Sequence, residues 1–157
     1  IEFDTDEITS TYDVYKIFIT NLHVSDDNVQ LYVQFSQGSS YVTSGYRFAN
    51  GQALDNGATT GVGETSEAFI RITRDFLGNV TGETSNWECT LPHPLGTDNG
   101  KLIYYSAVSI NHDPKVKKEL GAGAYLGNQT ALDAIKFYAS AGTLASGTFA
   151  IYGLAKS

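Results

Sequence analysis

The sequence predicts an all-β protein, an antiparallel β-sandwich with jelly-roll topology and about eight strands. Sixteen Gly, ten Tyr and eight Phe without any Met are typical of short strands joined by tight turns. Several segments alternate apolar and polar residues with the period of two that strands require. Long connections between these segments favour the jelly roll. A chain of 157 residues can bury a two-layer core, so residues 1–157 are expected to form one domain.

The first part of the chain is expected to form an edge strand followed by a hairpin. Ile1–Glu7 mixes apolar and acidic residues and predicts either an edge strand or an arm that reaches a neighbour. Tyr12–Leu22 has apolar residues on both faces, which places it between two layers or under a neighbouring subunit. Val29–Phe35 alternates most regularly, with its odd-numbered residues inward. Because Ser25–Asn28 consists of turn-forming residues, we predict that Tyr12–Phe35 is a hairpin.

The segment Ser36–Ser66 is rich in Gly, Ser, Asn and Thr and is expected to be mostly loop. Only Tyr46–Ala49 predicts a short strand, and Asn50-Gly51 and Asn56-Gly57 are turn signals. A connection of this length inside a compact domain is usually functional or disordered. It is therefore the first place in which we expect contacts with a partner.

The middle of the chain predicts three more strands, over Ala68–Arg74, Trp87–Leu91 and Lys101–Ile110. Asp113–Leu120 predicts a helix of one or two turns, with an acidic N-cap, Pro in the first turn and Gly after its end; a loop is the alternative. The glycine-rich Gly121–Gly127 follows no strand of a nucleotide-binding unit. It is expected to hold a short strand and a bend where backbones pass closely.

The chain closes with two apolar runs, Ala134–Tyr138 and Thr148–Leu154, which are separated by small residues. Their alternation predicts paired strands. An exposed apolar edge strand invites aggregation, so the last strand is expected to lie inside the sheet rather than at its edge.

Two blocks of residues carry a resemblance to known proteins. The first ends the chain, Phe137–Leu154, with the pattern S-G-T-F-x-I-Y-G-L. The second combines Tyr12–Ile17, Asn21–His23 and Leu31–Ser36 near the start. Together they resemble β-sandwich virion proteins of tailed phages, including decoration and tail-fibre-like proteins of marine and cyanobacterial phages. The shared residues are strand and turn residues, so the resemblance implies a fold, a place on the virion exterior and a homotrimer, but no chemistry.

Charge and composition argue against several function classes. A net charge of −7 does not suit nucleic acid, which needs clustered Lys and Arg. The sequence contains no run of eighteen apolar residues, which is the pattern that would predict a membrane span. Cys89 is the single cysteine, which rules out an internal disulfide framework, and it is expected to be a small buried residue rather than a nucleophile.

No motif for catalysis, metal or cofactor is expected. His23, His93 and His112 have no further ligand at metal-binding spacing. The acidic residues near positions 4–7 and 26–27 offer oxygen ligands for Ca²⁺, but they match no EF-hand loop and are expected to be solvated. We therefore predict that the protein is not an enzyme.

Aromatic side chains are the candidate binding residues: Tyr32, Tyr41, Tyr46 and Trp87. Their flat faces can stack on sugar rings or pack against a neighbouring subunit. Tyr and Trp are enriched in protein interfaces, so the interface is favoured over the glycan site.

The resulting expectation is a structural protein of a bacteriophage virion, a trimeric capsid decoration or cement protein. It would contact other phage structural proteins such as the major capsid protein. The alternative is a tail-fibre or spike head that binds a host surface glycan, with the missing initiator Met reflecting a longer parent chain. A free carbohydrate-binding module is a third, less favoured reading.

Overall fold

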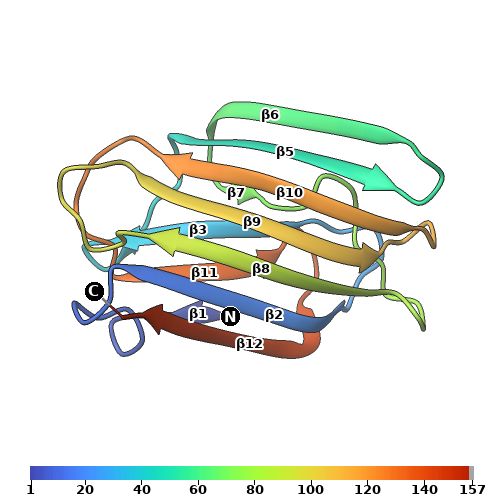
Figure 1. The fold of residues 1–157 in the computed structure, drawn as a ribbon, viewed down its shortest axis with the longest axis horizontal. Helices are drawn as coiled ribbons and strands as arrows, with labels where there is room; N and C mark the ends of the chain where they lie inside the picture. The colour runs from blue at the N-terminus through green and yellow to red at the C-terminus, as the bar shows by residue number, and fades with distance from the viewer. Residues whose placement is uncertain (156–157) are drawn as a thin grey trace.

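A computed structural model describes residues 1–155, which form twelve β-strands and no helix (Figure 1). The strands are β1 (Glu2–Phe3), β2 (Val14–Val24), β3 (Leu31–Gln37), β4 (Ser40–Tyr41), β5 (Tyr46–Leu54), β6 (Thr59–Glu67), β7 (Ile70–Arg71), β8 (Thr84–Pro92), β9 (Lys101–Ile110), β10 (Val116–Tyr125), β11 (Ala134–Ala139) and β12 (Leu144–Leu154). The predicted all-β class is therefore confirmed, with twelve strands in place of about eight.

The strands form two antiparallel sheets. The larger sheet has seven strands in the order β12-β2-β8-β9-β10-β5-β6, and the smaller has the order β1-β11-β3-β4, with β7 also paired to β3. In Figure 1, β6 and β12 mark opposite edges of the larger sheet. The chain passes repeatedly from one sheet to the other, as between β2 and β3 and between β10 and β11, whereas β8, β9 and β10 form a meander. The antiparallel β-sandwich is confirmed.

The core lies between the sheets and is built from the inward residues of alternating strands. In β2 these are Tyr15, Ile17 and Ile19, which share one face of the strand and are all buried. The predicted inward residues of the β3 region are buried in the same cluster: Val29, Leu31, Val33 and Phe35.

The predicted hairpin of Tyr12–Phe35 is wrong, because β2 and β3 lie in different sheets. β2 pairs with β8 and β12, and β3 pairs with β11, β4 and β7. The polar segment between them carries the chain across the sandwich. A hairpin turn and a crossing between sheets both need turn residues, so the local sequence does not distinguish them.

The segment predicted to be a loose connection, Ser36–Ser66, is mostly strand. It contains β4 and the long β5–β6 hairpin, which ends the larger sheet. The turn signal at Asn56-Gly57 is confirmed, since Gly57 lies at the hairpin tip with a φ of 83°. The signal at Asn50-Gly51 is wrong. Both residues lie inside β5, and the buried Asn50 amide donates from Nδ2 to the Arg71 carbonyl oxygen at 3.0 Å.

The helix predicted over Asp113–Leu120 is also wrong, because β10 begins at Val116. Residues of β10 alternate strictly, with Lys117 and Glu119 facing the interior and both side chains fully buried. The Lys117 ammonium lies 3.6 Å from Glu119 Oε2, and the Arg74 N–H donates to Glu119 Oε1. The charged residues of this segment suggest a solvated helix face. Here, pairing with β5 and β9 instead makes the segment a strand, in which successive residues alternate between the two faces of the sheet.

Glycines of the same strand are required by close contacts. A Cβ on Gly123 would collide with the Ile70 side chain, and one on Gly121 would lie 2.7 Å from the Ala49 carbonyl oxygen. The expected close approach is therefore confirmed, but it occurs within a strand and not in a bend.

The two ends of the chain lie at sheet edges. β1 is an edge strand of the smaller sheet, as one of the two expectations for Ile1–Glu7 had it. The predicted inner position of the last strand is wrong. Within residues 1–155, β12 pairs with β2 alone, and Tyr152 and Leu154 are 58% and 46% exposed. β11 and β12 lie in opposite sheets, where Phe137 and Phe149 meet with ring centroids 5.9 Å apart.

The buried Lys117–Glu119 pair generates a stability prediction. Burial lowers the pKa of Lys117 and raises that of Glu119, so each charge depends on the other. Lys117→Met or Glu119→Leu alone should reduce the free energy of unfolding by about 3–5 kcal/mol, because one charge stays buried without its partner. The double variant Lys117→Met/Glu119→Leu should lie close to the wild type. Urea denaturation at pH 7 measures this; losses that simply add in the double variant would contradict it.

Candidate functional site

Two of the four candidate aromatic residues belong to the core. Tyr46 is fully buried and Trp87 is 2% exposed. The Phe35 N–H donates to the Tyr46 hydroxyl at 2.8 Å, and the Trp87 ring lies beside that of Tyr105. Neither side chain can reach a partner or a sugar, so the prediction is wrong for these two. Alternation showed that they share a face with other apolar residues, but it did not show that this face is the inner one.

The other two candidates, Tyr32 and Tyr41, lie on the outer face of the smaller sheet and are half-buried. Tyr32 stacks on Phe69 with 3.9 Å between ring centroids. The Lys136 ammonium lies 3.7 Å from the centroid of the Tyr41 ring, a cation–π contact. The structure therefore brings Tyr32 and Tyr41 to the same outer face, with neighbouring side chains covering part of each ring.

A polar pocket of about 280 Å³ opens beside Tyr41. Its lining combines an aromatic ring with carboxylates and hydroxyls: Glu2, Asp4, Thr5, Ser36, Ser39, Tyr41, Asp133 and Ala134. Burial acts to raise the pKa of Asp133, but hydrogen bonds from Ser36 and from the Ser39 N–H hold that pKa below its ordinary value. Ionised carboxylates accept hydrogen bonds, and a ring supplies a flat apolar face, so the pocket can bind a polyhydroxylated molecule.

The outer face of the larger sheet holds most of the exposed apolar side chains of residues 1–155. Twelve large apolar side chains are exposed in this part of the chain, and eight of them lie at outward positions of this sheet. These eight are Phe18, Leu102, Tyr104, Val108, Val116, Leu120, Tyr152 and Leu154. The sequence analysis did not identify this surface as a site. The sequence of β9 nevertheless indicates it, because the residues on both faces of that strand are apolar.

A polar row along β8 divides this face. Glu88 forms an ion pair with Lys16 at 2.6 Å, and Asn86 and Thr90 occupy the neighbouring outward positions. On one side lies the β12–β2 patch, which we define as Phe18, Tyr152 and Leu154. On the other side lies the β9–β10 patch, which we define as Leu102, Tyr104, Val108, Val116, Leu120, Ala122 and Ala124.

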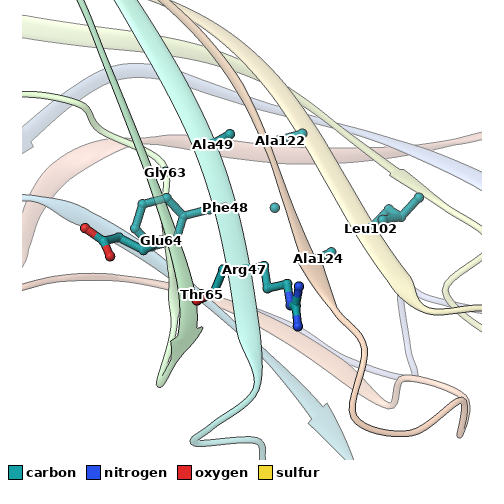
Figure 2. A pocket seen from close by; sticks show the side chains of 10 residues that line it. Arg47, Phe48, Ala49, Gly63, Glu64, Thr65, Leu102, Ala122 and Ala124 are labelled. Carbon is teal, nitrogen blue, oxygen red and sulfur yellow. The ribbon is translucent and has the colours of Figure 1, made fainter.

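A shallow groove of about 370 Å³ adjoins the β9–β10 patch (Figure 2). The register explains its floor, because Ala122 of β10, Ala49 of β5 and Gly63 of β6 are aligned across three neighbouring strands. Leu102 and Arg47 stand beside this row of small residues. Figure 2 shows the Phe48 ring and the Glu64 carboxylate projecting away from Arg47. The groove is consequently apolar and open to solvent.

Reactive groups do not gather in the described part of the chain. Within residues 1–155 no group of three or more His, Cys, Asp or Glu side chains is placed to hold a metal ion. The same residues contain no helix long and apolar enough to cross a membrane. The arrangements that the structure does offer are the polar pocket and the apolar outer face described above.

The motif at the end of the chain forms part of the fold: Phe137 lies in β11, and Ser146–Leu154 lies in β12. Its alternate residues Phe149 and Ile151 pack against the core, whereas Tyr152 and Leu154 face outward. A scan against known protein families found no match to the sequence, and a search of curated proteins found none either. The function is accordingly inferred from these surfaces.

Cys89 provides a test of the core described here. Its side chain is fully buried, and burial raises the pKa of the thiol to about 12. Because the thiolate is the reactive form, Cys89 should stay unreactive toward a thiol reagent at pH 8 in the folded protein and react completely in denaturant. Absorbance of the released chromophore measures both states. Rapid labelling without denaturant would show that the inner side of β8 is accessible.

Proposed function

We propose that the protein is a non-enzymatic structural component of the exterior of a tailed-phage virion, a homotrimeric capsid decoration protein. The observation that carries this proposal is the apolar outer face of the larger sheet, on which eight large side chains lack a covering layer. Clusters of exposed apolar side chains of this kind mark protein–protein contacts in soluble proteins. The resemblance of the two terminal blocks to virion proteins supports the same conclusion.

The division of this face into two patches fits such a role. A decoration protein contacts its own copies and the coat subunits beneath it, and each contact needs a surface of its own. Here the β9–β10 patch and the β12–β2 patch are separated by the Lys16–Glu88 row. A homotrimer would present one of them three times, so that weak single contacts with coat subunits add through effective concentration.

Contact area is what such a protein would contribute to the particle. Each apolar Å² removed from water stabilises a contact by about 25 cal/mol before the costs of association are subtracted. Clamped across joints between coat subunits, this contact energy opposes the outward pressure of packaged DNA. A rigid sandwich suits the task, because its hydrogen-bonded strands do not extend under load.

Particles that lack the protein test the proposal directly. They should release DNA at a lower temperature than complete particles, because the joints between coat subunits lose the added contacts. Dye binding to released DNA during heating measures the transition, and addition of the purified protein should restore the wild-type value. Equal heat resistance with and without the protein would count against a decoration role.

The polar pocket beside Tyr41 favours the second candidate, the head domain of a tail fibre or spike that binds a host glycan. Tyr41 offers a ring face, and Asp4, Glu2 and Asp133 offer acceptors for sugar hydroxyl groups. This combination is absent from the apolar groove on the opposite sheet, whose small floor residues Ala49, Gly63 and Ala122 supply no polar side chain.

This second candidate predicts that Tyr41→Ala abolishes binding to host cells and leaves the oligomer intact. Loss of the ring should remove the apolar face on which a sugar ring would stack. Tyr152→Ala, which removes an exposed aromatic ring from the other sheet outside the β9–β10 patch, is the matched control and should bind normally. Flow cytometry with labelled protein measures binding, and an unchanged signal for Tyr41→Ala would exclude the pocket.

A further inference from the structure

We propose that a second copy of this chain covers the β9–β10 patch, with Leu120 of one copy entering the groove of the other. The proposal rests on the oligomer in the proposed function and adds the surface through which its copies meet. Three properties of the patch support it: its area, its shape and its charge.

The exposed apolar area matches what an interface between identical subunits requires. Five large side chains of the patch are about half exposed, and with the neighbouring alanines they present on the order of 500 Å² of apolar surface. An interface of standard size buries about 800 Å² on each partner, and about 65% of it is apolar in homodimers. The apolar share of such an interface, roughly 500 Å² per partner, is present on this patch.

The shape of the patch is complementary to itself. Leu120 is 62% exposed because its neighbours across the strands are the small residues Gly51 and Ser106. It therefore projects from the face. Two residues further along β10, Ala122 and the aligned Ala49 form the floor of the groove. Around a three-fold axis the projection of one copy can enter the depression of the next, and here both features lie on the same strand.

The charge distribution favours contact between copies through this face over contact through other parts of the surface. The whole chain carries a net charge of −7, so two copies repel each other at most approaches. At outward strand positions, the larger sheet carries the cations Lys16, Arg47 and Lys118 and the anion Glu88 within residues 1–155. This face therefore carries a small excess of cations in place of the acidic excess, and two copies meet less like-charge repulsion here than at the remaining, acidic surface.

Other occupants fit the patch less well. A glycan needs hydrogen-bond partners, and the groove offers few besides Arg47 and Thr65. Nucleic acid needs clustered Lys and Arg, but Arg47 and Lys118 are the two cations beside this patch at outward strand positions of residues 1–155. Apolar side chains of a protein surface remain the complementary chemistry.

The experiment measures the mass of the full chain in solution by size-exclusion chromatography with light scattering, over a roughly hundredfold range of concentration. The wild type should form an assembly, and Leu120→Glu should weaken its association roughly hundredfold because an unpaired carboxylate would enter an apolar contact. Tyr152→Glu is the matched control, since Tyr152 is similarly exposed on the same sheet but lies in the β12–β2 patch. Thermal unfolding of each variant verifies that the fold is kept.

A second measurement uses the fact that the native cysteine, Cys89, is buried. Leu120→Cys places one accessible thiol in the patch, and a short bis-maleimide should join two copies through it. Tyr152→Cys should cross-link much less. These results support the proposal. A wild type that stays monomeric, an assembly that Leu120→Glu leaves intact, or stronger cross-linking at position 152 would each overturn it.

These results are separable from the particle experiment. An assembly that depends on Leu120 but does not protect particles supports the patch and contradicts the decoration role. A protein that protects particles while Leu120→Glu assembles normally contradicts the patch and leaves the decoration role standing.

Discussion

The fold depends on the packing of two sheets of unequal size, because the smaller sheet covers only part of the larger one. All seven strands of the larger sheet are nine residues or longer, whereas β1, β4 and β7 of the smaller sheet have two residues each. Hydrophobic burial is therefore concentrated where β3 and β11 face β2 and β8. Toward β5 and β6 the smaller sheet ends, and loop residues and the short β7 take over the covering role.

This inequality explains why charged residues lie inside the protein. Under β10, at the margin of the apolar core, the interior positions are filled by Lys117 and Glu119. The segment after β7 supplies their surroundings through the N–H of Arg74 and the carboxylate of Asp75. Buried polar groups need defined partners, so this pair fixes both the path of the segment and the register of β10.

The register of β10 in turn determines the outer surface. A shift by one residue would exchange the two faces of the strand. With Lys117 and Glu119 inward, Val116 and Leu120 must face solvent, on the same side of the sheet as Val108 and Leu102 of β9. The β9–β10 patch thus lies on the outward face of the same strand whose inward face carries the buried ion pair. Apolar residues on the second face of a sheet favour a further covering layer, and this preference is the physical basis of the contact between copies that we propose.

The sequence by itself determined the class of the fold and the inward residues of its clearest strands. Period-two alternation located β9 at the observed residues, Lys101–Ile110, and identified the odd-numbered residues of Val29–Phe35 as core. Alternation is a local property, so it needs no knowledge of the partner strand. Only the tertiary structure decided which strands pair, which end a sheet and which face is covered. The last strand lies at an edge, Tyr46 and Trp87 lie in the core, and Asp113–Leu120 runs into a strand, because hydrogen bonds and contacts with distant residues outweigh local preference there.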